Sequence, residues 1–150
     1  MDINLLKRLR EETGVSISLC KKALEESKNK IEDAKKLLTK WGAEKIKDKQ
    51  ERSTSEGGIF SYVHHNKKVA ALVEVLCETD FVSGNVEFQR LGQELAMQVA
   101  SSSPKDTSEL LKQEYIRDPS KKIEDLIKDA VLKFGENIKI ARFMKWNLGI

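Results

Sequence analysis

Cys77 and His64 are the residues of this sequence best suited to nucleophilic catalysis, which needs a thiol and a base about 3 Å apart. Residues 59–65 and 69–76 are rich in β-branched, aromatic and small apolar residues and predict the two strands of a hairpin. In that hairpin His64 faces Val69, eight residues from Cys77. At about 3.3 Å per strand residue, this separates the two groups by roughly 26 Å. We therefore interpret Cys77 as a small buried residue of a sheet.

Two other sets of side chains could bind a metal ion or transfer protons. His64 and His65 are neighbours on a predicted strand, where successive side chains point to opposite faces, so we do not expect them to hold one ion. Glu74, Glu78 and Asp80 would share one side of the chain if the strand continued, as Mg²⁺ binding or acid–base work requires. The sequence has no glycine-rich phosphate loop and no nucleophile elbow. We interpret the acids as the polar end of a strand.

The segment from Cys77 to Asn85 joins a predicted strand to a predicted helix and places Phe81 beside Asp80. A phenylalanine in a connection more often fills the core. An exposed phenylalanine on a rigid turn would instead anchor the protein in a groove of a partner. Composition alone leaves both interpretations open.

Length and composition limit the classes of protein to consider. The 150 residues suit one domain or two small ones, and no apolar run approaches the roughly 20 residues of a membrane helix. The N-terminus does not resemble a secretory signal, and two distant cysteines favour a reducing cytoplasm over a disulfide scaffold. The net charge is +3, and residues 1–52 hold 14 Lys/Arg against 10 Asp/Glu. This excess is too small for a dedicated nucleic-acid binder.

Apolar residues recur at helical spacing three times in the N-terminal part. The predicted helices cover residues 3–12, about 16–28 and about 30 onward into a charged tail that ends at 52. Thr13-Gly14 ends the first helix, and Ser16 or Ser18 caps the second. Three short amphipathic helices can bury their apolar sides only against one another, so we predict a three-helix bundle.

The C-terminal part has an alternating pattern of strands and helices. The polar, glycine-rich residues 53–58 predict a linker, and Asn66-Lys67 a tight hairpin turn that pairs Phe60 with Val73. Helices are predicted over 85–101, 107–115 and about 123–134, with a turn at 118–120. Alternation over 138–147 predicts a third strand with Ile138, Ile140, Arg142, Met144 and Trp146 on one face. The predicted fold class is α+β, a three-stranded antiparallel sheet with helices packed on one face.

Short motifs along nearly the whole chain point to one family. The N-terminal motifs are Leu9-Arg10, Thr13-Gly14-Val15, Cys20-Lys21-Lys22-Ala23-Leu24 and Glu56-Gly57. The central motifs are Tyr62-Val63-His64-His65-Asn66, Leu72-Val73-Glu74-Val75 and Cys77-Glu78-Thr79-Asp80-Phe81-Val82. The last are Asp118-Pro119-Ser120-Lys121, Gly135-Glu136-Asn137-Ile138 and Arg142-Phe143. Together they closely resemble the elongation factor Ts family.

This resemblance implies a ubiquitin-associated-like three-helix domain over residues 1–52 and a core domain over 53–150. It implies a guanine-nucleotide exchange factor for elongation factor Tu in the cytoplasm. Such a factor is not an enzyme, has no cofactor or metal of its own, and contacts neither nucleic acid nor a membrane.

The resemblance also implies two groups of site residues. In the family, one turn enters the GTPase domain of elongation factor Tu near its Mg²⁺ site and dislodges the ion, which accelerates GDP release. That turn falls on Thr79-Asp80-Phe81-Val82. Contacts of the N-terminal domain with the partner fall on Lys7, Arg10, Ile17 and Ser18.

The chain departs from the family pattern in two short motifs and in length. The family often has Met-Met-Asp where this chain has Ile17-Ser18-Leu19, and Asn-Gly where it has Asn66-Lys67. The chain resembles the short form with one core subdomain. Short-form relatives form homodimers, so we expect a symmetric dimer through a sheet edge or an apolar sheet face.

Three other functions remain open from the sequence. An interaction module that uses only residues 1–52 would be indifferent to changes at Phe81. A thiol enzyme would lose its activity on Cys77→Ser. A truncated relative would be inactive.

Overall fold

The computed structural model describes residues 2–150, apart from the side chains of residues 45 and 46. The chain forms two compact units. The first comprises the residues up to Glu51 together with Lys128–Gly135, and the second comprises Arg52–Ile127 and Glu136–Ile150. The mixture of helices with an antiparallel sheet confirms the predicted α+β class.

The first unit is built from the three amphipathic helices predicted in the N-terminal part and from part of a fourth, so the prediction that the three bury their apolar sides only against one another is wrong. The helices are α1 (Ile3–Thr13), α2 (Ile17–Glu26), α3 (Ile31–Lys49) and the second part of α7 (Ile123–Phe134). Asp2 caps α1 by accepting from the Asn4 amide at 2.9 Å, and Gly14 ends it with a φ of +68°, a conformation that favours glycine. Leu9 and Leu24 form the core with Leu132 of α7.

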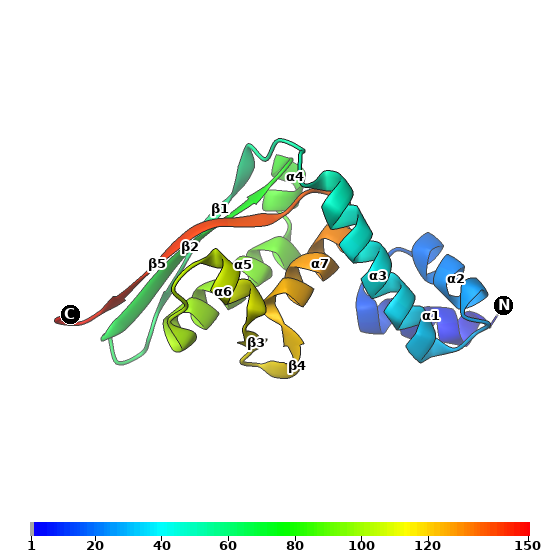
Figure 1. Cartoon of the computed structure of the whole chain (residues 1–150), viewed down its shortest axis with the longest axis horizontal. Coiled ribbons are helices and arrows are strands. Elements are labelled where there is room, and N and C mark those ends of the chain that lie inside the picture. The colour runs from blue at the N-terminus through cyan, green and yellow to red at the C-terminus, as the bar shows by residue number, and fades with distance from the viewer. Residues whose placement is uncertain (1) are drawn as a thin grey trace. The chain divides into compact units, whose positions relative to one another are not determined.

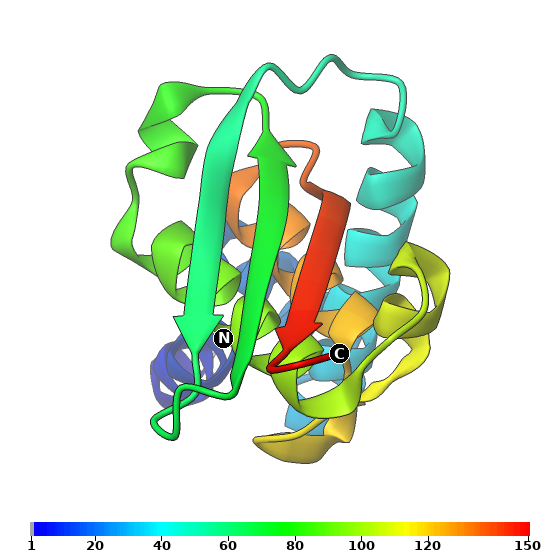
Figure 2. The same cartoon turned by 90° about the vertical axis from the view of Figure 1, so that its left-hand side faces the viewer.

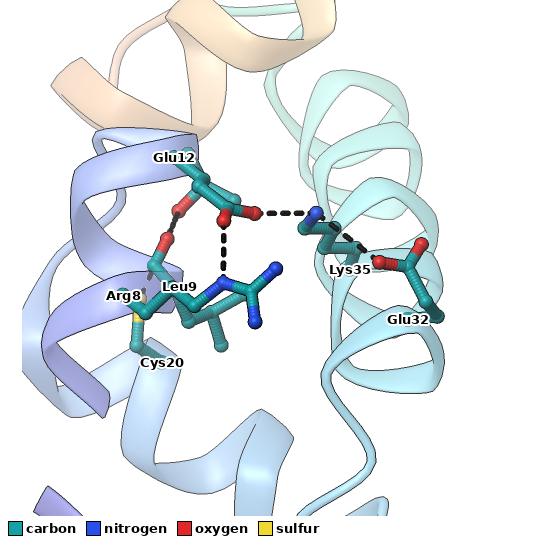
Figure 3. Close-up of polar contacts among 7 residues, drawn as sticks. Arg8, Leu9, Glu12, Cys20, Glu32 and Lys35 are labelled. Atoms are coloured by element: carbon teal, nitrogen blue, oxygen red, sulfur yellow. Dashed lines mark hydrogen bonds and ion pairs between the residues drawn. The ribbon is translucent and has the colours of Figure 1, made fainter. Parts of the chain in front are cut away.

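Ion pairs fix α1 against α3 (Figure 3). The carboxylate of Glu12 accepts from Arg8 at 2.7 Å and from Lys35 of α3 at 2.5 Å. Lys35 also pairs with Glu32 at 3.3 Å. The hydrogen bond from Lys35, followed by that from Arg8, lowers the pKa of Glu12 below its ordinary value. The two helices are thus joined by charge in addition to apolar packing.

The sheet of the second unit has the order β1 (Glu56–Val63), β2 (Val69–Cys77) and β5 (Lys139–Asn147), all antiparallel. Phe60 pairs with Val73, which confirms the predicted register. The hairpin turn is longer than predicted, because the Lys67 amide donates to the His64 carbonyl at 2.8 Å and Lys67 adopts a φ of +62°.

The predicted linker over 53–58 is wrong in its last three residues, which belong to β1. The conformation of Gly57 explains why glycines occur within a strand here. Its φ is +147°, and a Cβ at this position would lie 2.1 Å from the carbonyl oxygen of Val75. The two strands approach each other too closely for a side chain, so the glycine-rich composition reflects close strand pairing.

A β-bulge corrects the predicted face of the last strand. Glu74 pairs with Arg142 while Val75 pairs with Ile140, so Ala141 is an extra residue in β5. The bulge reverses the alternation: Ile140 is buried, whereas Met144 and Trp146 are 48% and 70% exposed. The prediction that these residues share one face with Ile138 is therefore wrong.

Helices cover one face of this sheet. They are α4 (Asp80–Ser83), α5 (Val86–Ser102) and α6 (Thr107–Lys112), followed by a two-stranded sheet of β3 (Glu114–Tyr115) and β4 (Asp118–Lys122). The helix predicted over 107–115 ends at Lys112, and the turn predicted at 118–120 is part of β4. Figure 1, in which the sheet is seen from its side, shows α5 and α6 on the same side of the three strands. Phe88 and Leu95 of α5 are fully buried against this inner face.

The opposite face of the sheet, called here the outer sheet face, is apolar and open toward the viewer in Figure 2. Its large exposed residues are Ile59, Val63, Leu72, Met144 and Trp146. Among the residues that the structure describes, no helix is both long and apolar enough to cross a membrane.

Candidate functional site

The turn after β2 is a single helical turn with a defined beginning and end. Thr79 is extended, with φ −128° and ψ 157°, and its side chain caps α4 by accepting from the Val82 amide at 3.4 Å. Gly84 follows α4, and its amide donates to the Asp80 carbonyl at 2.9 Å. We call residues 79–82 the exchange turn, after the role that the family resemblance implies for them.

Phe81 points away from the core. Its side chain is 87% exposed, while the next residue, Val82, is 8% exposed and anchors the turn. Asp80 is exposed as well. This exposure excludes one of the two interpretations left open by the sequence, that of a phenylalanine that fills the core. An exposed aromatic ring on a defined turn is suited to anchor the protein in a groove of a partner.

A carboxylate from a distant part of the chain holds the exchange turn. Glu136 accepts from the amides of Glu78 and Thr79, both at 3.0 Å, through one oxygen. Its other oxygen accepts from the Thr79 hydroxyl at 2.6 Å. No role for Glu136 was predicted from the sequence. The signal that marked it was its place in the motif Gly135-Glu136-Asn137-Ile138, directly after Gly135, which ends α7 with a φ of +71°.

A second carboxylate returns the contact in the opposite direction. Glu78 accepts from the Asn137 amide at 2.6 Å and pairs with Arg52 at 3.6 Å. Asn137 is buried, and its side-chain amide donates to the Arg52 carbonyl at 3.0 Å. The segments around 78 and 136 are therefore joined through both side chains and backbone.

The four predicted N-terminal contact residues are exposed. Lys7 and Arg10 lie one turn apart on α1, and Ile17 and Ser18 begin α2. Ile17 is 49% exposed, although its neighbours Val15 and Cys20 are buried in the core of the first unit. These residues belong to the first unit, whereas the exchange turn belongs to the second.

The structure disfavours thiol chemistry at Cys77. Cys77 pairs with Glu56 at the start of β1, whereas His64 follows the end of that strand, so the two lie at opposite ends of the hairpin as predicted. Burial raises the pKa of the Cys77 thiol, and its Sγ donates to the Thr79 carbonyl at 3.2 Å. A buried neutral thiol is a poor nucleophile.

The candidate metal ligands are not arranged for a metal. The rings of His64 and His65 lie 4.2 Å apart, contrary to the prediction of opposite faces, because β1 ends at Val63 and both histidines lie beyond it. The imidazole of His64 instead bonds the Tyr62 hydroxyl at 2.9 Å. Across residues 2–150, no three His, Cys, Asp or Glu side chains gather as ligands. Glu74 pairs with Arg142 at 2.9 Å.

Comparisons with known proteins agree on one family. A family model described as Elongation factor TS matches residues 78–149, which include the exchange turn and Glu136. The chain is 39% identical to a protein named Elongation factor Ts from Thermosipho melanesiensis, over 97% of each chain. Relatives of the same name from Methylacidiphilum infernorum and Thermotoga neapolitana are 36% and 37% identical, over 99% of this chain and 96% and 98% of theirs.

These relatives contain positions that this chain lacks. The alignment with the Thermosipho protein runs over 190 positions, whereas the chain has 150 residues. At least 40 positions of the alignment therefore contain a residue of the Thermosipho protein and a gap in this chain. The match nevertheless reaches both the N-terminal helices and the closing strand, since nearly all of the chain is aligned.

Proposed function

Because the chain belongs to the elongation factor Ts family of translation elongation factors, we propose that it is a guanine-nucleotide exchange factor for elongation factor Tu. The observation that carries this proposal is the 87% exposure of Phe81 on a turn that Glu136 holds by hydrogen bonds. Such a side chain is suited to insertion between elements of a partner, which is a mechanical action and requires no bond chemistry.

The proposed action is the loss of Mg²⁺ from the partner. The exchange turn enters the GTPase domain of elongation factor Tu, and Phe81 wedges between elements near the bound ion. Mg²⁺ requires near-ideal octahedral geometry, so a small displacement of its surroundings weakens it strongly. Without the ion, the phosphates of GDP are less neutralised and the nucleotide leaves faster.

The cycle closes through thermodynamic reciprocity. If the factor weakens GDP binding by a given ratio, a nucleotide weakens binding of the factor by the same ratio. Rebinding of a nucleotide therefore releases the factor, which acts repeatedly. Lys7, Arg10, Ile17 and Ser18 supply the additional proposed contacts, with two cations and one exposed apolar side chain among them.

We also propose a domain organisation, a location in the cell and an oligomeric state for the protein. Residues 1–52 form a ubiquitin-associated-like domain and 53–150 the core domain, and the protein acts in the cytoplasm. A second copy of the chain covers the outer sheet face, because five large apolar side chains are exposed there together. The face carries Glu74 and Arg142 as an internally neutralised pair, so two copies can approach without repulsion at this point.

Release of a fluorescent GDP analogue from elongation factor Tu tests the proposed function. We expect wild type to accelerate release and Phe81→Ala to lower the stimulated rate roughly thirtyfold, since truncation of an aromatic anchor costs about 2 kcal/mol or more. Ile116→Ala is the matched control, because Ile116 is 44% exposed in the same unit but lies outside the exchange turn.

Two results would contradict the proposal. A folded wild-type chain that leaves the release rate unchanged would exclude exchange activity. Equal effects of Phe81→Ala and Ile116→Ala would exclude the exchange turn as the acting element. In the second case, the search would move to the contacts of the N-terminal helices.

A further inference from the structure

The contacts of Glu136 suggest a role beyond stability of the fold. We propose that Glu136 is a positioning residue that holds the exchange turn in the conformation in which Phe81 is presented to the partner. This inference rests on the proposed function. Glu136 touches Glu78 and Thr79 only, at 2.6–3.0 Å, among its hydrogen bonds in the described residues, and it acts on Phe81 through them.

The geometry makes the Thr79 side chain the link between Glu136 and α4. The Thr79 hydroxyl has one proton, which it donates to Glu136 at 2.6 Å. Its oxygen then remains free to accept from the Val82 amide at 3.4 Å. The carboxylate therefore selects the hydroxyl orientation that caps α4. Phe81 lies between Thr79 and Val82, the two residues joined by this cap.

The exchange turn needs such support because it is short and Val82 is its one buried residue. α4 has four residues, and an isolated helix of this length is unstable in water. Phe81 also gains nothing from its exposed position in the free protein. We call the hydrogen bonds that Glu136 accepts from Glu78 and Thr79 the brace. Without the brace, the turn would sample conformations in which the Phe81 ring covers neighbouring apolar surface. A fixed turn avoids that ordering cost when the partner binds.

The second carboxylate makes the brace reciprocal. Glu136 accepts from the amides at 78 and 79, while Glu78 accepts from the amide of the next residue, Asn137. Each segment thus supplies both an anion and backbone donors to the other. Charge-assisted hydrogen bonds of this kind are short and about twice as strong as neutral ones. These hydrogen bonds join residues 57–59 positions apart, so they anchor a local turn to the distant segment between α7 and β5.

The test combines a structural and a functional measurement. Amide hydrogen exchange by NMR in the free chain reports the donors at Glu78 and Thr79. Stimulated release of the GDP analogue from elongation factor Tu reports function. The variants are Glu136→Ala, Phe81→Ala and the double variant. Glu56→Ala is the control, because Glu56 is exposed, lies in the same unit and makes no side-chain hydrogen bond among the described contacts.

We expect Glu136→Ala to raise amide exchange at 78 and 79 at least about tenfold and to slow stimulated GDP release about tenfold, as the loss of charge-assisted bonds predicts. In the Phe81→Ala background, Glu136→Ala should add less than about twofold, because residues acting through one another are not additive. A general loss of stability would slow release equally in both backgrounds. Glu136→Gln, which retains one acceptor oxygen, should fall between wild type and Glu136→Ala.

Each contrary result has a distinct meaning. Unchanged amide protection in Glu136→Ala would overturn the brace, and additive slowing would overturn the action through Phe81. If Glu136→Ala does not fold, Glu136→Gln decides by the same two criteria. Loosened amides with an unchanged release rate would also overturn the proposal, provided that Phe81→Ala slows release. If Phe81→Ala has no effect although wild type is active, the proposed role of the exchange turn is wrong. Amide exchange at residues 78 and 79 then tests only whether Glu136 holds the turn.

Discussion

Glu12 shows how one side chain fixes two helices, because Arg8 and Lys35 converge on its carboxylate (Figure 3). The hydrogen bond from Lys35, then that from Arg8, lowers its pKa from an ordinary value of 4.5. A carboxyl group whose pKa is lower in the folded than in the unfolded chain stabilises the fold when ionised. Its contribution is complete above the unfolded pKa and disappears as the pH falls through the folded one.

We therefore expect Glu12→Gln to lower the melting temperature at pH 7, with a difference from wild type that shrinks below about pH 4.5 and vanishes in stronger acid. The effect should be small and weaken with salt, since the groups are exposed. Thermal unfolding at a series of pH values measures it. Glu11→Gln, at the exposed neighbouring position, is the control. A difference that stays constant down to pH 2 would contradict the linkage.

The exposure of Phe81 marks the limit of residue-level prediction. The sequence places an aromatic residue in a short connection but does not say whether it faces the core. The deciding contacts come from Glu136, 57 positions from Thr79 along the chain. No local pattern reveals a bond over that distance. The position of the turn was predictable, whereas its support was not.

At the scale of elements, the packing of α5 on β1 depends on Gly92. The ring of Phe60 lies against this glycine so closely that a Cβ would be 2.2 Å from it. The ring also lies 2.8 Å from a Cβ built at Gly58, so it has glycine on two sides. The helix α5 can therefore approach β1 this closely only because residue 92 has no side chain.

Gly92→Ala should thus destabilise the protein by about 1–3 kcal/mol, as expected of overpacking, although alanine favours helix by about 1 kcal/mol. Gly42→Ala in α3 is the matched control. A Cβ there has ordinary contacts, the nearest 3.4 Å from the Lys128 carbonyl, so this variant should be neutral or more stable. Denaturation in urea measures both. A stabilised Gly92→Ala would show that the Phe60 ring moves freely.

The sequence predicts the elements better than their ends. Hydrophobic periodicity locates the longer helices of both units and the three strands of the antiparallel sheet, because each of these elements must bury one side, whereas the short α4, β3 and β4 were not predicted. The first residues of β1 and the hairpin turn were misplaced, since glycine and lysine there adopt conformations that composition does not distinguish. The bulge at Ala141 was missed because it depends on pairing with β2.

At the scale of the whole molecule, the outer sheet face predicts the oligomeric state. If a second copy covers this face, Trp146→Lys should convert a dimer to a monomer, because each copy would bury a lysine ammonium group without a partner. Sedimentation velocity distinguishes the two species. Ile116→Lys, a change at an exposed apolar residue outside the face, should leave the dimer intact. A monomeric wild type at micromolar concentration would contradict the proposal.

Ala141 sets the parity of β5. Before it, the even-numbered Ile138 and Ile140 are buried; after it, the odd-numbered Phe143 and Lys145 are the less exposed ones, and even-numbered residues face outward. One methyl-bearing residue thus decides which half of the strand's apolar residues belongs to the interior and which to the surface. Deletion of Ala141 would exchange the buried and the exposed side chains of one half of the strand. The side chains that the outer sheet face presents to a partner therefore depend on the number of residues in β5 as well as on their types.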